Sequence, residues 1–395
     1  MKMKNTLLAA FVFVAGVASA QVASTASAGA SSEKTLFERI TKIEKKNEWF
    51  NAYLNLHTGF NTRFNQNGTG GFDDAAFSVS ELRLEVTGKV TDWLSYRWRQ
   101  RLNRGYDARM GDDNVPPATD VAGIGIQATK GLSLFAGRQC IAYGGFEFYA
   151  NPIEIYKYSE IVDHMNIFMT GLSVTYDFTP TQQLSLQVLN SNGRPATEFY
   201  GENIVASRLP LVYSIGWNAS MCNDLWQTRW SFSAMNEVSD KYMYYVALGN
   251  QFNFSPKWNM YIDFMGSIEN IDRKGMMTEI LGSTDNHNVE NAVYGAVVAK
   301  VNYRFLPKWN FFVKGMLDSA AMLESTDRYT KGNYRTTLGY LAGVEFYPME
   351  DSNLHFFCTF VGQTNLFTEK AKAFGKSDYS TQGASLGLIY KLPMF

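Results

Sequence analysis

Apolar and polar side chains alternate one by one in many short runs between Trp49 and the end of the chain. The clearest runs cover residues 50–57, 81–86, 226–233, 260–265 and 385–391. Successive side chains of a β-strand point to opposite faces, so a period of two predicts a strand with one apolar and one polar face. The pattern therefore indicates an all-β protein.

About sixteen strands account for the alternating runs, and the connections between them are short and long in turn. We expect these strands near residues 50–65, 77–90, 93–103, 120–130, 132–139, 167–178, 183–191, 210–220, 225–236, 241–254, 257–269, 291–305, 308–319, 335–347, 353–363 and 380–392. One connection on the long side, 237–240, is short. A soluble β-sandwich also alternates, but its strands are usually shorter. We therefore predict a 16-stranded antiparallel transmembrane β-barrel over residues 49–395.

Aromatic residues are abundant, with 22 Tyr, 28 Phe and 8 Trp among 395 residues, although the mean hydropathy is only −0.20. Trp93, Trp258 and Trp309 each follow a short turn, where a membrane barrel carries a girdle of aromatic side chains. No stretch approaches the roughly 18 consecutive apolar residues of a membrane helix. These features favour a barrel in a membrane over a soluble globule.

The N-terminal region has the pattern of an export signal followed by a spacer. Residues 1–20 combine a positive start, a short apolar core and the small residues Ala18-Ser19-Ala20, so we expect a cleaved signal peptide. Residues 21–48 contain a small-residue linker and an amphipathic stretch, which predicts a short periplasmic helix. The expected location is the outer membrane of a Gram-negative cell.

Catalytic and metal-binding patterns are absent from the sequence. The histidines at 57, 164, 287 and 355 are scattered, and Cys140, Cys222 and Cys358 form no CxxC or CxxH spacing. The odd number of cysteines leaves at least one free thiol. The net charge of −1, without a basic block, argues against a nucleic-acid partner. We expect no enzyme, no cofactor and no metal site.

Three arginines alternate with outward-facing apolar side chains in the strand expected at 93–103. If Tyr96 and Trp98 face lipid, then Arg97, Arg99 and Arg101 line the lumen at intervals of about 6.6 Å. Guanidinium groups bind phosphate and carboxylate, and a row of weak sites lets an anion pass from one to the next. This strip is a candidate anion track.

The neighbouring strand offers an alternative interpretation of the same strip. Its alternation places Glu81, Arg83 and Glu85 beside the three arginines on the lumen side. Arg83 would extend the basic strip, whereas the two carboxylates could neutralise it. The arginines would then brace the wall instead of binding solutes.

The longest expected loop, residues 140–166, is the candidate constriction loop because such a loop folds into the barrel of general porins. Its candidate residues are Tyr143, Glu147, Tyr149, Glu154 and Lys157. The loop is aromatic and net acidic, and an acidic constriction opposes anion selectivity. The aromatic side chains could stack on sugars or peptides, or could pack the loop against the wall.

Two segments resemble the phosphate-selective porin O and P family. Residues 82–102 are similar to the family's strand, Gly-Lys-x-Thr-Asp-x-Leu-Ser turn and second strand, and residues 133–145 are similar to its Gly-Arg strand and Gly-rich loop entry. The resemblance implies a sixteen-stranded, typically trimeric channel. It also implies that Arg97, Arg99, Arg101 and Arg138 correspond to an arginine ladder in the lumen. The family's third loop is basic, whereas the corresponding loop here, residues 140–166, is net acidic.

We therefore expect an outer-membrane porin for passive diffusion of small hydrophilic solutes, with phosphate or other anions as candidate solutes. Its expected partners are outer-membrane lipid and two further copies of the chain in a homotrimer. Two alternatives remain. A channel that prefers sugars or peptides would use the loop aromatics at the constriction, and a structural or adhesive barrel would have a plugged lumen.

Overall fold

The computed structural model describes residues 48–65, 71–104, 113, 115–191, 195–283, 285–349 and 352–394. All of them belong to the larger of two compact units of the chain, Lys34–Phe395. The signal peptide and periplasmic helix expected from the sequence lie outside the described residues.

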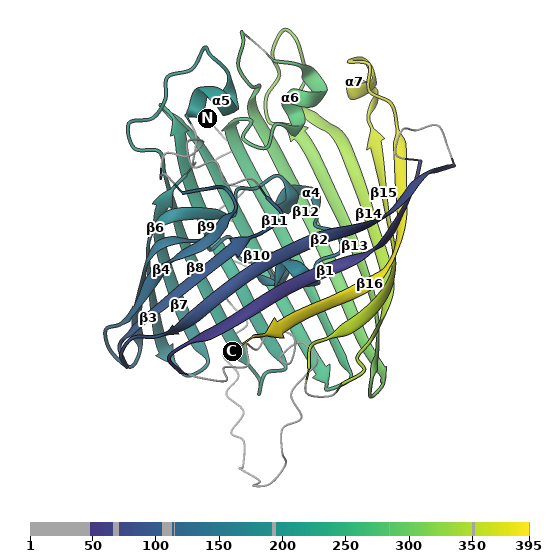
Figure 1. Ribbon diagram of the computed structural model, residues 1–395. Helices are drawn as coiled ribbons and strands as arrows, with labels where there is room; N and C mark the ends of the chain where they lie inside the picture. The colour runs from purple at the N-terminus through teal and green to yellow at the C-terminus, as the bar shows by residue number, and fades with distance from the viewer. Residues whose placement is uncertain are drawn as a thin grey trace. The chain divides into compact units, whose positions relative to one another are not determined.

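Sixteen strands of the described residues form one closed antiparallel barrel, in which each strand pairs with its sequence neighbours and β1 pairs with β16 (Figure 1). They are β1 (Asn51–Phe64), β2 (Phe72–Lys89), β3 (Leu94–Arg101), β4 (Thr119–Gln127), β5 (Leu132–Cys140), β6 (Phe168–Thr179), β7 (Gln182–Asn190), β8 (Leu211–Met221), β9 (Trp226–Val238), β10 (Lys241–Ser255), β11 (Trp258–Ile271), β12 (Glu290–Leu306), β13 (Trp309–Met322), β14 (Gly332–Phe346), β15 (His355–Phe367) and β16 (Tyr379–Pro393). The predicted 16-stranded antiparallel barrel is confirmed.

The largest departure from the expected strand limits is at β2, which begins at Phe72 instead of residue 77. The extra residues pair with the end of β1, where the Arg63 guanidinium lies 2.5 Å from the Asp74 carboxylate. The rings of Phe64 and Phe72 also lie 5.7 Å apart. Two consecutive aspartates interrupt the apolar–polar alternation in this segment, so the sequence pattern does not predict a strand here. The segment is nevertheless a strand, because it pairs with β1.

Short helices occur in the connections of the described chain. They are α3 (Phe146–Tyr149), η2 (Pro152–Glu154), α4 (Glu160–Asp163), α5 (Ala196–Tyr200), α6 (Met276–Leu281) and α7 (Glu369–Lys372). None of these described helices has the length and apolar character needed to cross a bilayer. Helices α5, α6 and α7 lie at one rim of the barrel (Figure 1), which we call the long-loop rim. The opposite end, with its tight connections, is the short-turn rim.

The two faces of the barrel wall have different side chains. In β13, Phe311, Val313 and Leu317 are exposed and alternate with buried Phe312 and Lys314. The exposed face is apolar, as a lipid-facing surface requires. Trp93, Trp258 and Trp309 are also exposed, and each follows a turn of the short-turn rim. They lie where the sequence predicted an aromatic girdle.

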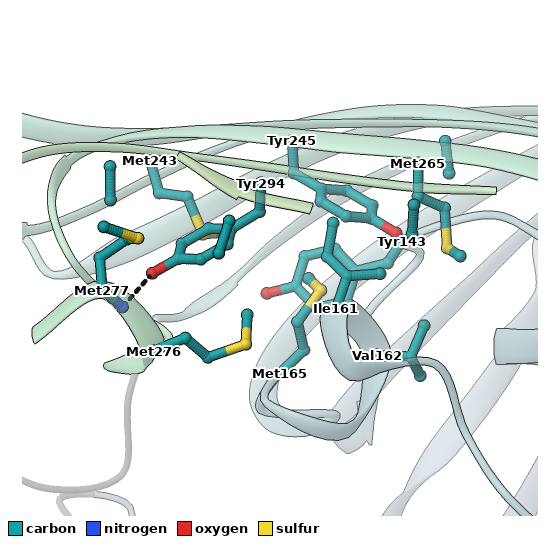
Figure 2. Packing of buried hydrophobic residues seen from close by; sticks show 14 of the residues in the cluster. Tyr143, Ile161, Val162, Met165, Met243, Tyr245, Met265, Met276, Met277 and Tyr294 are labelled. Atoms are coloured by element: carbon teal, nitrogen blue, oxygen red, sulfur yellow. Dashed lines mark hydrogen bonds between the residues drawn. The ribbon is translucent and has the colours of Figure 1, made fainter. Parts of the chain in front are cut away.

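A buried apolar cluster lies against part of the inner wall of the barrel. The cluster joins residues of the β5–β6 connection and α6 to inward side chains of β9 to β14, and methionine and tyrosine are prominent in it. Figure 2 shows Met243, Met265 and Tyr245 of the wall facing Ile161 and Met165 of the connection. Among the described residues, all three cysteines are free thiols.

Candidate functional site

The connection between β5 and β6, residues 141–167, folds into the barrel; we call it loop 3. It turns inward at Gly144 and Gly145, whose φ angles are 73° and 81°. A Cβ on Gly144 would lie only 2.5 Å from the Ser231 hydroxyl of β9. Glycine is required here because the backbone is left-handed and passes directly against the wall. The Gly-Gly pair of the sequence is thus the point at which loop 3 enters the lumen.

Acidic side chains of the wall hold the two helical turns of loop 3 by their backbone. The Asp263 carboxylate of β11 accepts hydrogen bonds from the amides of Phe146 and Glu147, at 2.9 and 2.8 Å. Asp318 of β13 accepts one from the amide of Ile161 at 3.2 Å. Each carboxylate meets a helical turn at its N-terminus, where unpaired amides favour an acceptor. Loop 3 is therefore fixed to β11 and β13.

Basic side chains of the wall neutralise the carboxylates of loop 3. The Lys314 ammonium forms an ion pair with buried Glu147. The Arg335 guanidinium lies 3.1 Å from Glu160. Both cations project inward from β13 and β14. The two loop carboxylates are therefore paired with cations of the barrel wall.

The remaining charged side chains of loop 3 differ in exposure. Glu154 lies 3.5 Å from the His355 imidazole and is only 11% exposed. Burial raises the pKa of Glu154 to about 7. Lys157 and Asp163 lie 3.7 Å apart, and the Asp163 side chain is 51% exposed.

The aromatic side chains of loop 3 mostly serve packing. Tyr143 is buried, and the Tyr156 ring stacks on the ring of Phe312 at 5.2 Å. The Tyr156 hydroxyl also donates to Glu345 at 3.0 Å. Tyr149 differs, because it is 40% exposed although it lies inside the barrel. It is the candidate among these aromatics for contact with a solute.

The arginine strip expected from the sequence converges on one aspartate. A β-bulge between Arg99 and Gln100 leaves Asp120 as the extra residue of β4, and a bulge re-aims a side chain. Its carboxylate lies 3.1 Å from Arg99 Nε and 2.7 Å from Arg101 Nε. Arg83 Nη1 approaches it at 3.3 Å. These three guanidinium groups are largely buried and brace the wall around Asp120.

Arg97 has a different environment from the rest of the strip. Its guanidinium lies 2.8 Å from the Glu85 carboxylate, which also lies 3.6 Å from the Lys391 ammonium of β16. The Arg97 side chain is 41% exposed, whereas that of Glu85 is 3% exposed. A solute in the lumen thus meets the cation and not the carboxylate.

Arg138 does not join this cluster. Its register partner in β4 is Ala122, next to Gly123, which pairs with Arg97. Paired residues share a face of a sheet, so Arg138 lies by register on the face opposite to Arg97. Its guanidinium lies 2.6 Å from Asp113 and donates to the carbonyl of Thr119. The ladder position implied for Arg138 by resemblance is therefore not a lumen position.

Two lumen cations were not singled out from the sequence. Arg229 of β9 lies under the Tyr149 ring, with its guanidinium carbon 5.2 Å from the ring centroid. Lys300 of β12 lies 4.8 Å from the centroid of the Phe312 ring. Both belong to alternating runs in which the large apolar residues of the outward face are the stronger signal. The inward position of Arg229 between Thr228 and Trp230 could have identified it.

No group of three or more His, Cys, Asp or Glu side chains in the described ranges could hold a metal ion. The arrangement offers charged and aromatic contacts along a lumen.

Comparison with known proteins places these features in a family. The sequence matches the family described as phosphate-selective porin O and P over residues 50–392. No curated protein is detectably similar in sequence.

Solved structures share the fold at low sequence identity. The outer membrane channel DcaP of Acinetobacter baumannii is 12% identical, with a TM-score of 0.59 over 87% of this chain and 97% of that chain. OmpF of Salmonella typhi, in complex with daunomycin, is 13% identical, with a TM-score of 0.56 over 87% and 97%. In-vitro folded OmpT of Vibrio cholerae is 11% identical, with a TM-score of 0.54 over 89% and 100%. At these identities the likeness concerns the fold.

Proposed function

The chain belongs to the phosphate-selective porin O and P family, and on that premise we propose that its lumen favours small anions, phosphate among them, over cations. Family membership and the barrel fold support an outer-membrane channel for small solutes rather than an enzyme. The selectivity is the part that requires an argument from the lumen.

The difference in exposure between Arg97 and its carboxylate partner carries the proposal. Arg97 is 41% exposed and Glu85 only 3%, so the field that a solute meets at this wall is that of the guanidinium. The acidic loop 3 does not oppose this preference, because Glu147 and Glu160 are paired with Lys314 and Arg335. The sequence alone leaves these carboxylates facing the pore.

Reversal potentials of the purified protein in planar bilayers under a salt gradient test the proposal. The wild type should prefer chloride over potassium, and Arg97→Gln should move the reversal potential toward the cation value. Arg63→Gln is the matched control, since Arg63 is an exposed arginine that pairs with Asp74. Cation preference in the wild type, or equal shifts in both variants, would contradict the proposal.

The sugar- or peptide-preferring channel has weaker support. It needs aromatic side chains at the constriction, but Tyr143, Phe146 and Phe148 of loop 3 are buried in packing. A plugged structural barrel also has weaker support. Ser95, Arg97 and Thr175 face the lumen and keep partial exposure beside the docked loop.

Assembly and processing complete the proposal. We infer a homotrimer in outer-membrane lipid, since OmpT of Vibrio cholerae has a trimer form. We also infer that residues 1–20 are cleaved on export and that residues 21–48 form a periplasmic linker and helix. Chemical cross-linking and N-terminal sequencing of the exported protein test these points.

A further inference from the structure

Arg229 is a lumen-facing cation whose guanidinium forms no ion pair within the described ranges of the chain. Its strand neighbour Ser231 is buried against the carbonyl of Tyr143, which shows that this face of β9 points inward. Arg229 is itself only partly buried. A cation that is partly removed from water and has no carboxylate partner favours an anion supplied from outside the protein.

The side chains beside Arg229 are neutral amides. Its register partner in β8 is Asn218, which carries no charge and donates a hydrogen bond to Gln183 at 3.1 Å. Gln227, the preceding inward residue of β9, accepts from Gln251 of β10 at 3.3 Å. Amides of this kind hydrogen-bond polar solutes without competing for the guanidinium as a carboxylate would.

Asp263 is the wall carboxylate level with Arg229. It is two strands away, and its two oxygens accept hydrogen bonds from the amides of Phe146 and Glu147. Its hydrogen-bonding capacity is therefore directed to loop 3 and not to Arg229.

Tyr149 adds a flat apolar surface to the site. Its ring covers one side of the Arg229 guanidinium at 5.2 Å, and the side chain remains 40% exposed. Aromatic rings attract other rings in offset or edge-to-face contact. Inorganic phosphate would use only the guanidinium, whereas a planar organic anion would use both groups.

We propose that Arg229 and Tyr149 form a binding site in the lumen for the carboxylate of a planar organic anion. The carboxylate accepts from the guanidinium and the planar group lies against the exposed part of the Tyr149 ring. This inference rests on the proposed anion preference and extends it to a class of organic solute. The site is separate from the Arg97–Glu85 pair, which belongs to β3 and β2.

Block of chloride current in planar bilayers tests the site, with benzoate, cyclohexanecarboxylate and inorganic phosphate as probes. Benzoate should block the wild type at lower concentration than the other two. Arg229→Gln should raise the half-blocking concentration of benzoate about tenfold, because one charge-assisted contact is lost. Tyr149→Leu should remove the advantage of benzoate over cyclohexanecarboxylate.

Two further variants separate binding from folding. Arg229→Lys keeps the charge and should recover part of the benzoate block, while Arg63→Gln should leave block unchanged. Equal benzoate block in wild type and Arg229→Gln, or no preference for benzoate over cyclohexanecarboxylate, would overturn the inference. Loss of the Arg97 effect on reversal potential would instead overturn the proposed function, so the two failures are distinct.

Discussion

The two sides of the barrel interior stabilise their side chains in different ways. Along β9 to β14 the inward side chains are covered by loop 3 and form an apolar cluster with a few enclosed ion pairs. Along β2 to β4 the inward side chains are mostly charged, and three arginines share Asp120. The first side resembles the core of a soluble protein, whereas the second is a network of largely buried ion pairs with an exposed guanidinium, that of Arg97, beside it. The difference teaches that a solute can reach the interior only where a cation stays exposed, at Arg97 on the charged side and at Arg229 at the edge of the covered side.

The largest expected effect comes from breaking a pair on the covered side. Lys314→Met leaves Glu147 charged and enclosed, which costs about 3–5 kcal/mol in buried pairs. Loop 3 should therefore leave its docked position, and the single-channel conductance should rise. Glu147→Gln combined with Lys314→Met is the control, because it removes both charges and should keep loop 3 docked. An unchanged conductance in the single variant would show that the pair does not hold the loop.

Apolar packing on the covered side should give the next largest effect. Ile153 of η2 is buried against Phe357 and Ile389, so Ile153→Ala should weaken loop docking by about 2–4 kcal/mol. Protease cleavage within loop 3 of the folded barrel measures this change. Ile155→Ala is the matched control, since Ile155 is only partly buried. Equal cleavage of both variants would argue that packing around η2 contributes little.

A change on the charged side should alter selectivity more than stability. Asp120→Asn removes the carboxylate shared by Arg83, Arg99 and Arg101. Anion preference should increase, opposite in sign to the effect of Arg97→Gln, while the free energy of unfolding falls by about 1–3 kcal/mol. Reversal potentials and thermal denaturation in detergent measure the two effects. An unchanged reversal potential would mean that Asp120 does not influence the permeation path.

The smallest effect should be a pH dependence of loop docking. Burial raises the pKa of Glu154 to about 7 from an ordinary value of 4.5, although His355, Lys300 and Lys391 oppose the shift and Glu345 adds to it. Because the pKa is raised in the docked state, this contribution is fully present below about pH 4.5 and is lost as the pH rises through about 7. Protease cleavage of loop 3 should therefore become faster between pH 6 and 8.

Glu154→Gln should remove this pH dependence, because the amide does not titrate. Asp163→Asn, which changes an exposed carboxylate of the same loop, should retain it. The same profile in the wild type and in Glu154→Gln would assign the titration to another group.

The strands could be predicted from the sequence because alternation is a local property. The inward direction of Arg97 and Arg99 followed from the same rule, with Trp98 exposed on the other face. The role of Asp120 could not be predicted, because a bulge is not visible in the residue pattern. Arg138 shows the limit of resemblance, since its register places it on the opposite face.

Partners that are distant in sequence were also beyond prediction. The acidity of loop 3 suggested a negative constriction, but Lys314, which neutralises Glu147, follows it by 167 positions. The contact between Arg229 and Tyr149 could not be predicted either, because the position of Tyr149 depends on the inward turn of the whole loop. Charge compensation across a barrel depends on strand order and register, which composition does not encode.

The attachment of loop 3 to the far wall sets an order for folding. Glu160 accepts a hydrogen bond from Gln363 of β15, 203 positions later in the chain. Contacts of such sequence separation form late, because the entropy of closing the intervening chain must be overcome first. The sheet must therefore extend to β15 before loop 3 can complete its contacts, and until then its apolar side chains stay uncovered.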